Sequence, residues 1–155
     1  MKPRAARLAL LLLFSITASF CWAADADRKH IVLDESAKRK TFPFSDAVVV
    51  GNTLYLAGTV GFDQSGKVPP APEEEAKLAM DAVKQVLESQ SLSIDDLVSV
   101  QVYCTDFTLY DRFNAVYRTY FHEQFPARAF LGVSSLIRGA HFEITGIAVK
   151  RLKNP

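Results

Sequence analysis

The sequence predicts an α+β fold in which two helices pack on one face of a mixed sheet, with the element order ββ-α-β-α-ββ. Short runs of β-branched residues alternate with two stretches that carry apolar residues at helical spacing. Turn residues separate these runs. The chain has 155 residues, of which 49% are hydrophobic and 23% charged. This composition suits one globular domain and excludes a wholly disordered or collagen-like chain.

The chain begins with a segment typical of a secretory signal peptide, residues 1–23. Three basic residues precede an apolar run at 8–20, and small residues follow at Ala23 and Ala24, so we expect cleavage after Ala23. The apolar run has about 13 residues, whereas a membrane span needs about 20, so a membrane anchor fits less well. A lipoprotein cut before Cys21 also fits less well, because the bulky Phe20 stands where a small residue is expected.

Removal of this segment changes both the charge and the cysteine count. It takes away three basic residues, which turns a net charge of +1 into −2, and it leaves one of two cysteines, Cys104. Cys104 alternates with polar neighbours on a predicted strand, so we expect it to be buried. The signal predicts a periplasmic or secreted protein with no membrane association after cleavage. The balanced charge argues against nucleic acid as a partner.

The elements follow in order along the remaining chain. The polar residues 24–41 predict a flexible lead-in or an edge strand, and a single domain covers 42–152. A hairpin is expected over 46–58, because β-rich runs at 47–50 and 53–57 flank a Gly-Asn turn. Residues 61–72 hold two glycines and three prolines, which indicates a loop.

The first helix begins at Pro72, and the acidic run Glu73–Glu75 suits a solvated first turn. Its apolar face is Ala76, Ala79, Met80, Val83, Val86 and Leu87. The second helix is predicted over 109–123, before Pro126, with the apolar face Phe113, Val116, Tyr117, Tyr120 and Phe121.

Three further strands are predicted at 98–104, 128–135 and 141–152. In the last strand the side chains alternate between two faces. One face holds Phe142, Ile144, Gly146 and Ala148, and the other holds Glu143, Thr145, Ile147 and Val149.

Several kinds of site have no sequence support. His30, His122 and His141 are scattered, and none pairs with another metal ligand at a suitable spacing. We expect His122 and His141 to be structural or exposed. No glycine-rich phosphate loop or dinucleotide motif is present. A Ser-His-Asp triad stays open, although the sequence lacks a Gly-x-Ser-x-Gly elbow.

Two charged residues stand among apolar strand residues. Arg128 follows Pro126 at the start of a strand, and Glu143 lies in the next strand. Buried charges need partners. The two side chains therefore either pair with each other and tie the strands together, or share a polar cavity. An arginine offers a planar fork that fits a carboxylate, and a glutamate can act as a general base.

Four segments give the chain a family resemblance. They are Gly51–Gly58, Phe113–Tyr117, Phe125–Arg128 and Glu143–Val149, and the Pro-Ala-Arg element in the third is the most specific. In this order they resemble the RidA family, also called YjgF, the reactive-intermediate imine deaminases. The resemblance covers about residues 42–150, nearly all of the chain after the signal segment.

The resemblance implies a chorismate-mutase-like fold and a homotrimer with three clefts between its subunits. It implies that Arg128 binds the carboxylate of a 2-imino acid, and that Glu143 positions the water that attacks the imine carbon. The products would be a 2-oxo acid and ammonia, made without a metal or an organic cofactor. Asn114 matches an asparagine associated with the cleft or the trimer contact.

The resemblance also places Phe44, Ala57, Gly58 and Phe130 at the substrate, and there the chain departs from the family. Family deaminases usually have tyrosine at Phe44, serine at Ala57, cysteine at Phe130 and an acid at Thr145. The pocket should therefore be more apolar, and we expect a bulkier, more hydrophobic substrate or weak deaminase activity. The alternative is a trimer that binds a small ligand or a protein without catalysis, or one that is purely structural with a closed cleft.

Overall fold

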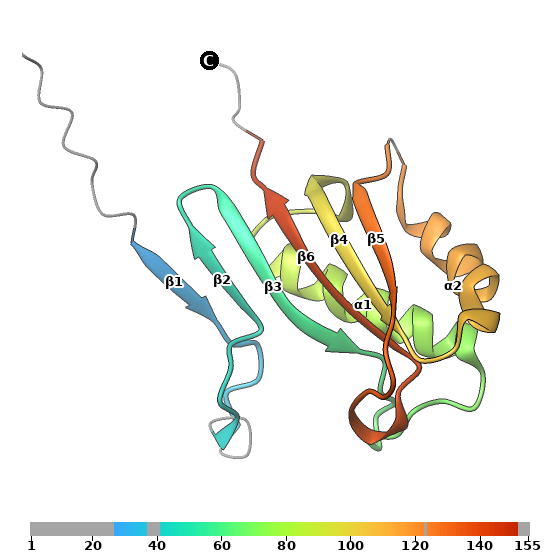
Figure 1. Cartoon of the computed structure of the whole chain (residues 1–155). Coiled ribbons are helices and arrows are strands. Elements are labelled where there is room, and N and C mark those ends of the chain that lie inside the picture. The colour runs from blue at the N-terminus through green and yellow to red at the C-terminus, as the bar shows by residue number, and fades with distance from the viewer. Residues whose placement is uncertain (1–26, 37–40, 123, 152–155) are drawn as a thin grey trace, which may run out of the picture.

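The computed structural model describes residues 27–36, 41–122 and 124–151, which form one mixed sheet with two α-helices (Figure 1). The predicted signal segment, 1–23, lies outside these residues. The elements are β1 (Arg28–Ile31), β2 (Ala47–Val50), β3 (Thr53–Val60), α1 (Pro72–Ser89), β4 (Leu97–Cys104), α2 (Tyr110–Tyr117), β5 (Ala127–Gly132) and β6 (Phe142–Val149). This confirms the predicted α+β class.

The sheet of the described residues has six strands in the order β1-β2-β3-β6-β4-β5. All neighbours are antiparallel except β4 and β5, which run parallel. Parallel neighbours need a crossover, and α2 supplies it between β4 and β5. The predicted hairpin is confirmed as β2 and β3, and its turn places Gly51 at a φ of +60°, which favours glycine.

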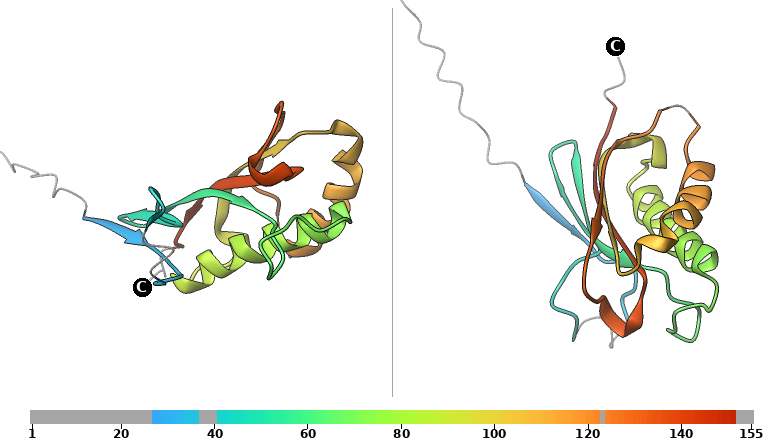
Figure 2. Two further views of the ribbon diagram at one scale, coloured as in Figure 1. Left: turned by 90° about the horizontal axis from the view of Figure 1, so that it is seen from below. Right: turned by 45° about the vertical axis from the view of Figure 1, so that its right-hand side comes forward.

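Both helices lie on the same face of the sheet (Figure 2). All six residues of the predicted apolar face of α1 are buried in the core, beneath the sheet. On α2, Phe113 and Tyr117 are buried and Val116 is partly buried against the same core. Tyr120 and Phe121, which follow α2, are also partly buried against it. The opposite face of the sheet carries no helix in the described parts of the chain, and we call it the open face.

The alternation predicted for the last strand is confirmed in β6. Phe142, Ile144, Gly146 and Ala148 are buried on the helix side, while the four residues between them are only partly buried on the open face. Cys104, on the neighbouring β4, is 1% exposed as expected, and burial raises the pKa of its thiol. A buried thiol with a raised pKa is unreactive.

The lead-in contains a strand, β1, which pairs with β2 at the edge of the sheet, so the edge-strand alternative is confirmed. One element differs from the prediction. The second helix stops at Tyr117 and continues as a 3₁₀ turn to Tyr120, instead of reaching residue 123. The Thr119 hydroxyl donates to the Val116 carbonyl, and the Tyr120 hydroxyl donates to Asp81 of α1 at 2.7 Å. The first of these bonds uses a backbone carbonyl near the end of the helix, as side chains there can do, and the second ties the 3₁₀ turn to α1.

The first turn of α1 is not solvated throughout, which corrects the prediction for Glu73–Glu75. Glu75 is completely buried, because the helical period places it beside Ala76 and Ala79 on the inner face. Glu73 lies outside and pairs with Arg112 of α2, which lowers the pKa of the Glu73 carboxyl.

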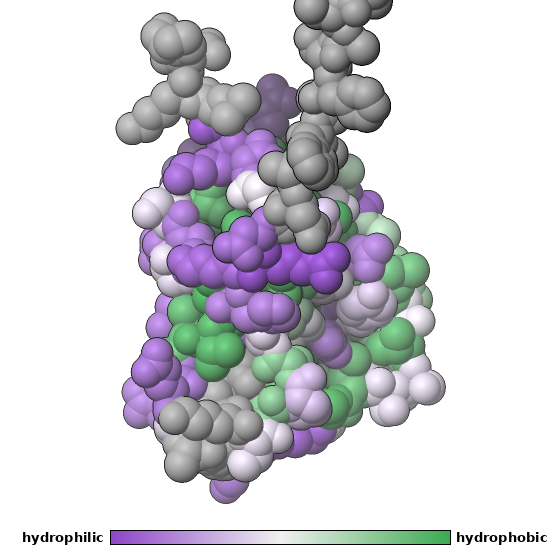
Figure 3. All heavy atoms as spheres, turned by 90° about the vertical axis from the view of Figure 1, so that its left-hand side faces the viewer, coloured by the Kyte–Doolittle hydropathy of each residue, from purple (hydrophilic) through white to green (hydrophobic). Residues whose placement is uncertain are grey.

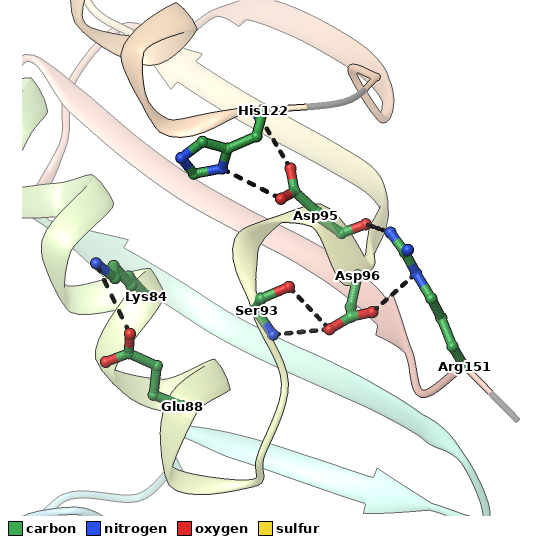
Figure 4. Close-up of polar contacts among 7 residues, drawn as sticks. All are labelled: Lys84, Glu88, Ser93, Asp95, Asp96, His122 and Arg151. Atoms are coloured by element: carbon green, nitrogen blue, oxygen red, sulfur yellow. Dashed lines mark hydrogen bonds and ion pairs between the residues drawn. The ribbon is translucent and has the colours of Figure 1, made fainter. Parts of the chain in front are cut away.

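A polar cluster joins the segment before β4 to the ends of α2 and β6 (Figure 4). His122 contacts Asp95 through both its backbone N–H and its ring, each at 3.2 Å, and the backbone bond holds the pKa of Asp95 below its usual value. Asp96 accepts hydrogen bonds from Ser93 and pairs with Arg151. His122 therefore has the structural, exposed position that the sequence predicted.

Seen from the β1 edge, apolar side chains gather below a band of hydrophilic ones (Figure 3). Exposed apolar residues of the two segments beside that edge are Val32, Leu33, Phe42 and Phe44. In the described residues, no helix has the length and apolar character needed to cross a membrane.

Candidate active site

Arg128 is the second residue of β5, and its side chain lies on the helix side of the sheet. It stands opposite the buried Val100 of β4. Its guanidinium carbon lies 4.6 Å above the centre of the Tyr117 ring and 5.6 Å from that of Phe130. In the described residues the Arg128 side chain has these cation–π contacts and no ion pair with a carboxylate.

A cavity of about 200 Å³ surrounds this arginine. Its lining residues are Tyr110, Asn114, Tyr117, Arg118, Phe125, Pro126 and Arg128. Asn114 and Tyr117 lie three positions apart on α2, so the helix presents both to the same cavity. Asn114 is only 7% exposed, which is unusual for an amide side chain. The structure thus brings Asn114 and Arg128 together, as the resemblance implied.

Tyr117 is a residue of this cavity whose role the sequence did not indicate. Burial raises the pKa of Tyr117 to about 12, although the charge of Arg128 acts in the opposite direction. Within the described parts of the chain, its buried hydroxyl has no hydrogen-bond partner. The spacing of Tyr117 one helical turn after Asn114 is consistent with a place in this cavity. The same spacing is equally consistent with a core position, so the sequence alone did not distinguish the two.

Phe130 lies behind Arg128 and does not line this cavity. Its ring makes edge contacts with Tyr110 at 4.8 Å and with Phe113 at 5.5 Å between ring centres. It therefore fixes the place of Arg128 from the core side. The expectation that Phe130 lies directly against the substrate finds no support in this geometry.

Glu143 is the second residue of β6, and its side chain lies on the open face of the sheet, beside Tyr103 of β4. It borders a second cavity, of about 320 Å³, lined by Gly58, Tyr103, Val133, Leu136, Glu143 and Thr145. The Thr145 hydroxyl donates to the Leu56 carbonyl at 2.7 Å. Thr145, which stands where the family usually has an acid, thus uses its hydroxyl proton in a hydrogen bond to the backbone of β3.

Gly58 and Glu143 are in close contact. A Cβ atom placed on Gly58 would lie 1.8 Å from Oε1 of Glu143, far inside van der Waals contact. The register of β3 against β6 shifts between Leu56 and Thr59, so Gly58 lies in an irregular part of the strand. Glycine is needed here because the carboxylate occupies the space of a side chain.

Phe44 and Ala57 lie next to this second group. Together they line a cavity of about 560 Å³ with His30 and Tyr55, and a smaller one of about 200 Å³ that includes Gly58. Phe44 is 53% exposed and stacks on Phe42 with ring centres 5.6 Å apart. The predicted residues thus fall into two groups, one around Arg128 and the other around Glu143.

Arg128 and Glu143 do not meet within one chain, which corrects the prediction of a pair or a shared cavity. Strand β4 separates their strands (Figure 1). Arg128 aligns with Val100 and Glu143 with Tyr103, and residues an odd number apart on a strand face opposite sides of the sheet. The two charged residues therefore occupy two half-sites on opposite faces.

The three histidines have separate surroundings. His30 contacts the Ser45 hydroxyl at 3.1 Å, His122 contacts Asp95, and His141 contacts Glu75. No group of three or more His, Cys, Asp or Glu side chains in the described residues is placed to hold a metal ion.

Comparisons with known proteins place this chain among close relatives. A family model described as Endoribonuclease L-PSP matches residues 35–150. The mouse protein named 2-iminobutanoate/2-iminopropanoate deaminase is 37% identical over 124 residues, which cover 79% of this chain and 92% of the mouse protein.

Solved structures of related proteins have the same fold. The crystal structure of a putative endoribonuclease from Thermotoga maritima superimposes with a TM-score of 0.72 at 36% identity, covering 79% of this chain and 98% of that one. The YjgF gene product from Escherichia coli gives a TM-score of 0.69 at 30% identity, covering 72% and 91%. The chain has the chorismate-mutase-like fold that the resemblance implied.

Proposed function

The chain belongs to the RidA/YjgF/L-PSP family, and on that premise we propose that it hydrolyses reactive 2-imino acids to 2-oxo acids and ammonia. Relatives named as deaminases of 2-iminobutanoate and 2-iminopropanoate support the reaction class. The observation that carries the proposal is the cavity formed by Arg128 and Asn114.

This cavity is suited to a carboxylate. The Arg128 guanidinium is held over the Tyr117 ring, and no acid of the described residues pairs with it. A charged fork of N–H donors binds a carboxylate in a bidentate manner, with more specificity than a point charge. We expect Arg128 to bind the carboxylate of the imino acid and Asn114 to contribute an amide hydrogen bond.

Glu143 supplies the base that the hydrolysis needs. We expect its carboxylate to accept a proton from a water molecule as the oxygen of that water bonds to the imine carbon. When the imine nitrogen is protonated, the electron pair of the C=N bond passes to nitrogen, and the carbon then carries both hydroxyl and amine. Glu143 returns its proton to the nitrogen and accepts the proton of the hydroxyl group, so the C=O bond forms as the C–N bond breaks, which releases ammonia and leaves the 2-oxo acid. Proton transfer by a positioned side chain contributes about 10²–10⁴-fold in rate.

We propose further that three copies of the chain assemble so that Arg128 of one copy approaches Glu143 of the next. The two half-sites lie on opposite faces of the sheet. Contact between different surfaces of identical chains gives a ring when the rotation from copy to copy closes, and we propose that three copies close it here. The open face carries exposed apolar side chains, among them Tyr55 at 47% and Leu131 at 40%. Exposed apolar patches mark interaction surfaces.

Release of ammonia or 2-oxo acid from 2-iminobutanoate or 2-iminopropanoate, generated in situ, tests the reaction. We expect turnover by the wild-type protein, and a loss of at least about 100-fold in Arg128→Ala and in Glu143→Gln. A rate equal to that of buffer, or full activity in Arg128→Ala, would exclude the reaction.

Phe44 and Ala57 support a preference for larger apolar substrates. Both line the cavity of about 560 Å³ that adjoins the Glu143 group, and neither offers a hydrogen bond there through its side chain. Competition between 2-iminobutanoate and imino acids with longer apolar side chains measures this preference. A Phe44→Tyr variant should shift it toward the smaller substrate.

The alternative is a trimer that binds a carboxylate ligand without turnover. It is favoured by the replacement of usual polar residues by Phe44, Ala57 and Thr145, since the Thr145 hydroxyl is engaged by the Leu56 carbonyl. Calorimetry with a stable 2-oxo acid separates the two functions. Binding that depends on Arg128, without hydrolysis of any imine, would support the alternative.

We also propose that residues 1–23 direct the protein to the periplasm or the cell exterior, and that it binds no nucleic acid. Mass measurement of the protein recovered from each cell fraction tests export, with cleavage of the signal segment expected after Ala23.

Incubation with single-stranded RNA tests the proposal that the protein binds no nucleic acid. We expect no cleavage of the RNA, because the net charge of −2 after removal of residues 1–23 does not favour binding of a polyanion.

A further inference from the structure

A buried carboxylate lies behind Glu143, on the other face of the sheet. Glu75, in the first turn of α1, is 0% exposed. Its Oε1 accepts hydrogen bonds from the backbone N–H groups of His141 at 2.6 Å and of Phe142 at 3.0 Å. Its Oε2 contacts Nδ1 of His141 at 2.7 Å. All three contacts end at the start of β6, one or two residues before Glu143.

The backbone of His141 is held from both sides. Glu75 accepts its N–H, and its carbonyl accepts a hydrogen bond from the N–H of Thr105 at the end of β4, at 3.1 Å. The start of β6 is therefore tied to α1 and β4 at once. A buried N–H that loses its acceptor is destabilising, so this arrangement depends on an acceptor at position 75.

The same helical turn also fixes β3. A Cβ atom on Gly61 would lie 2.0 Å from the carbonyl oxygen of Glu75 and 3.0 Å from the Ala79 nitrogen, so the chain after β3 packs directly on the α1 backbone. β3 carries Gly58, against which the Glu143 carboxylate lies. The start of α1 thus contacts both β6, which carries Glu143, and the segment after β3, the strand against which the Glu143 carboxylate packs.

We propose that Glu75 is a positioning residue for the deaminase reaction, which sets the placement of the Glu143 carboxylate through the start of β6. The proposal rests on the proposed function of Glu143. Glu75 itself cannot touch a substrate, because it is buried on the helix side while Glu143 lies on the open face. Hydrogen-bonded neighbours that orient a reacting group determine its activity although they take no part in the chemistry.

Glu75→Gln, compared with Glu74→Gln on the same helical turn, tests the proposal. Glutamine keeps the shape and one carbonyl acceptor but loses the charge that strengthens all three contacts. With both variants folded, we expect kcat of Glu75→Gln to fall by about 10- to 100-fold with little change in KM, because a small misplacement of a reacting group has this effect. Glu74→Gln should behave like the wild type.

A double-mutant cycle separates positioning from a general structural role. If Glu75 acts through Glu143, the loss caused by Glu75→Gln disappears when Glu143→Gln is already present, and persists when Arg128→Ala is present. An equal loss in both backgrounds would overturn the proposal. If Glu75→Gln does not fold, His141→Ala is tested in its place. This variant removes the contact between the His141 ring and Glu75 and leaves the two backbone hydrogen bonds. An unchanged kcat in His141→Ala would then overturn the proposal.

A measurement without turnover distinguishes failure of this proposal from failure of the proposed function. Carbon NMR of the Glu143 carboxyl, across a pH titration, reports its surroundings directly. Glu75→Gln should shift that resonance or its titration midpoint, while Glu74→Gln should leave both in place. An unchanged Glu143 resonance in Glu75→Gln would overturn the positioning role, whether or not the wild-type protein hydrolyses imines.

Discussion

Arg128 shows how one side chain can be charged, partly buried and still available to a ligand. Its partners among the residues that the structure describes are the rings of Tyr117 and Phe130, and no carboxylate there pairs with it. A cation over an aromatic ring gains about 0.5–2 kcal/mol. Arg128 and Asn114 line the same cavity. A carboxylate of a ligand bound there could therefore become a partner of the guanidinium.

Arg128→Lys tests the importance of the planar fork. Lysine keeps the charge but cannot bind a carboxylate in a bidentate manner or stack as well on Tyr117. We expect KM to rise by about tenfold or more, with a smaller change in kcat, because substrate binding is the step affected. Arg112→Lys, at the outer pair with Glu73, is the matched control and should not change KM. An unchanged KM in Arg128→Lys would contradict a carboxylate-binding role.

Tyr117→Phe tests the unpartnered hydroxyl. The substitution keeps the ring beneath Arg128 and removes a buried O–H that has no partner in the described residues. Removing such a group leaves the free energy of unfolding unchanged or raises it by about 1 kcal/mol. Urea denaturation measures the effect. A loss of more than about 1 kcal/mol would mean that the hydroxyl is hydrogen-bonded in the native assembly.

Gly58→Ala tests the contact between Gly58 and Glu143. The new methyl group would lie where Oε1 of Glu143 now lies, and the flexible carboxylate is the group that must move. We expect kcat to fall by about tenfold or more, while the free energy of unfolding changes little, because only a side-chain end is displaced. Steady-state kinetics and urea denaturation check both parts. Full activity would show that the placement of the carboxylate against Gly58 is not needed.

At the scale of elements, the sequence predicted most of the fold because its patterns are local. The alternation of β6 and the apolar face of α1 each follow from the spacing of neighbouring residues. The early end of α2 was not predictable, since it depends on the hydrogen bond from Tyr120 to Asp81 of the other helix. The burial of Glu75 was not predictable either, because its hydrogen-bond partners are 66 and 67 positions away in the chain.

The sequence indicated candidate residues for the site, but it did not indicate their arrangement. The family pattern pointed to Arg128, Asn114, Gly58 and Glu143, and the structure places them in two groups. Their separation depends on strand order, because β6 and β5 are adjacent in the sequence but β4 lies between them. A pattern of spacings contains no information about which strand becomes the neighbour of which.

At the scale of the whole molecule, several surface carboxylates couple stability to pH. Hydrogen bonds or a neighbouring arginine lower the pKa values of Asp63, Glu73, Asp95 and Asp106. Each contributes stability that is present above its unfolded pKa and is lost as the pH falls through its folded value. The urea midpoint should be level from neutral pH to about 5 and should fall below about 4. A midpoint that rises on acidification would contradict these contacts.

At the scale of the assembly, the proposed ring of copies would bring the two half-sites together. One chain holds the Arg128 cavity on the helix side of the sheet and the Glu143 cavity on the open face. Neither half can carry out the proposed hydrolysis alone, since binding and proton transfer must act on one substrate. A ring of copies would bring the halves together at each contact between neighbours.

Complementation between two inactive variants tests this arrangement most directly. Arg128→Ala and Glu143→Gln chains are mixed in equal amounts, dissociated and reassembled, and imine hydrolysis is measured against each variant reassembled alone. If each cleft takes Arg128 from one copy and Glu143 from another, about a quarter of the clefts regain both residues, and about a quarter of the wild-type activity returns. Activity no greater than that of the separate variants would contradict a site shared between copies.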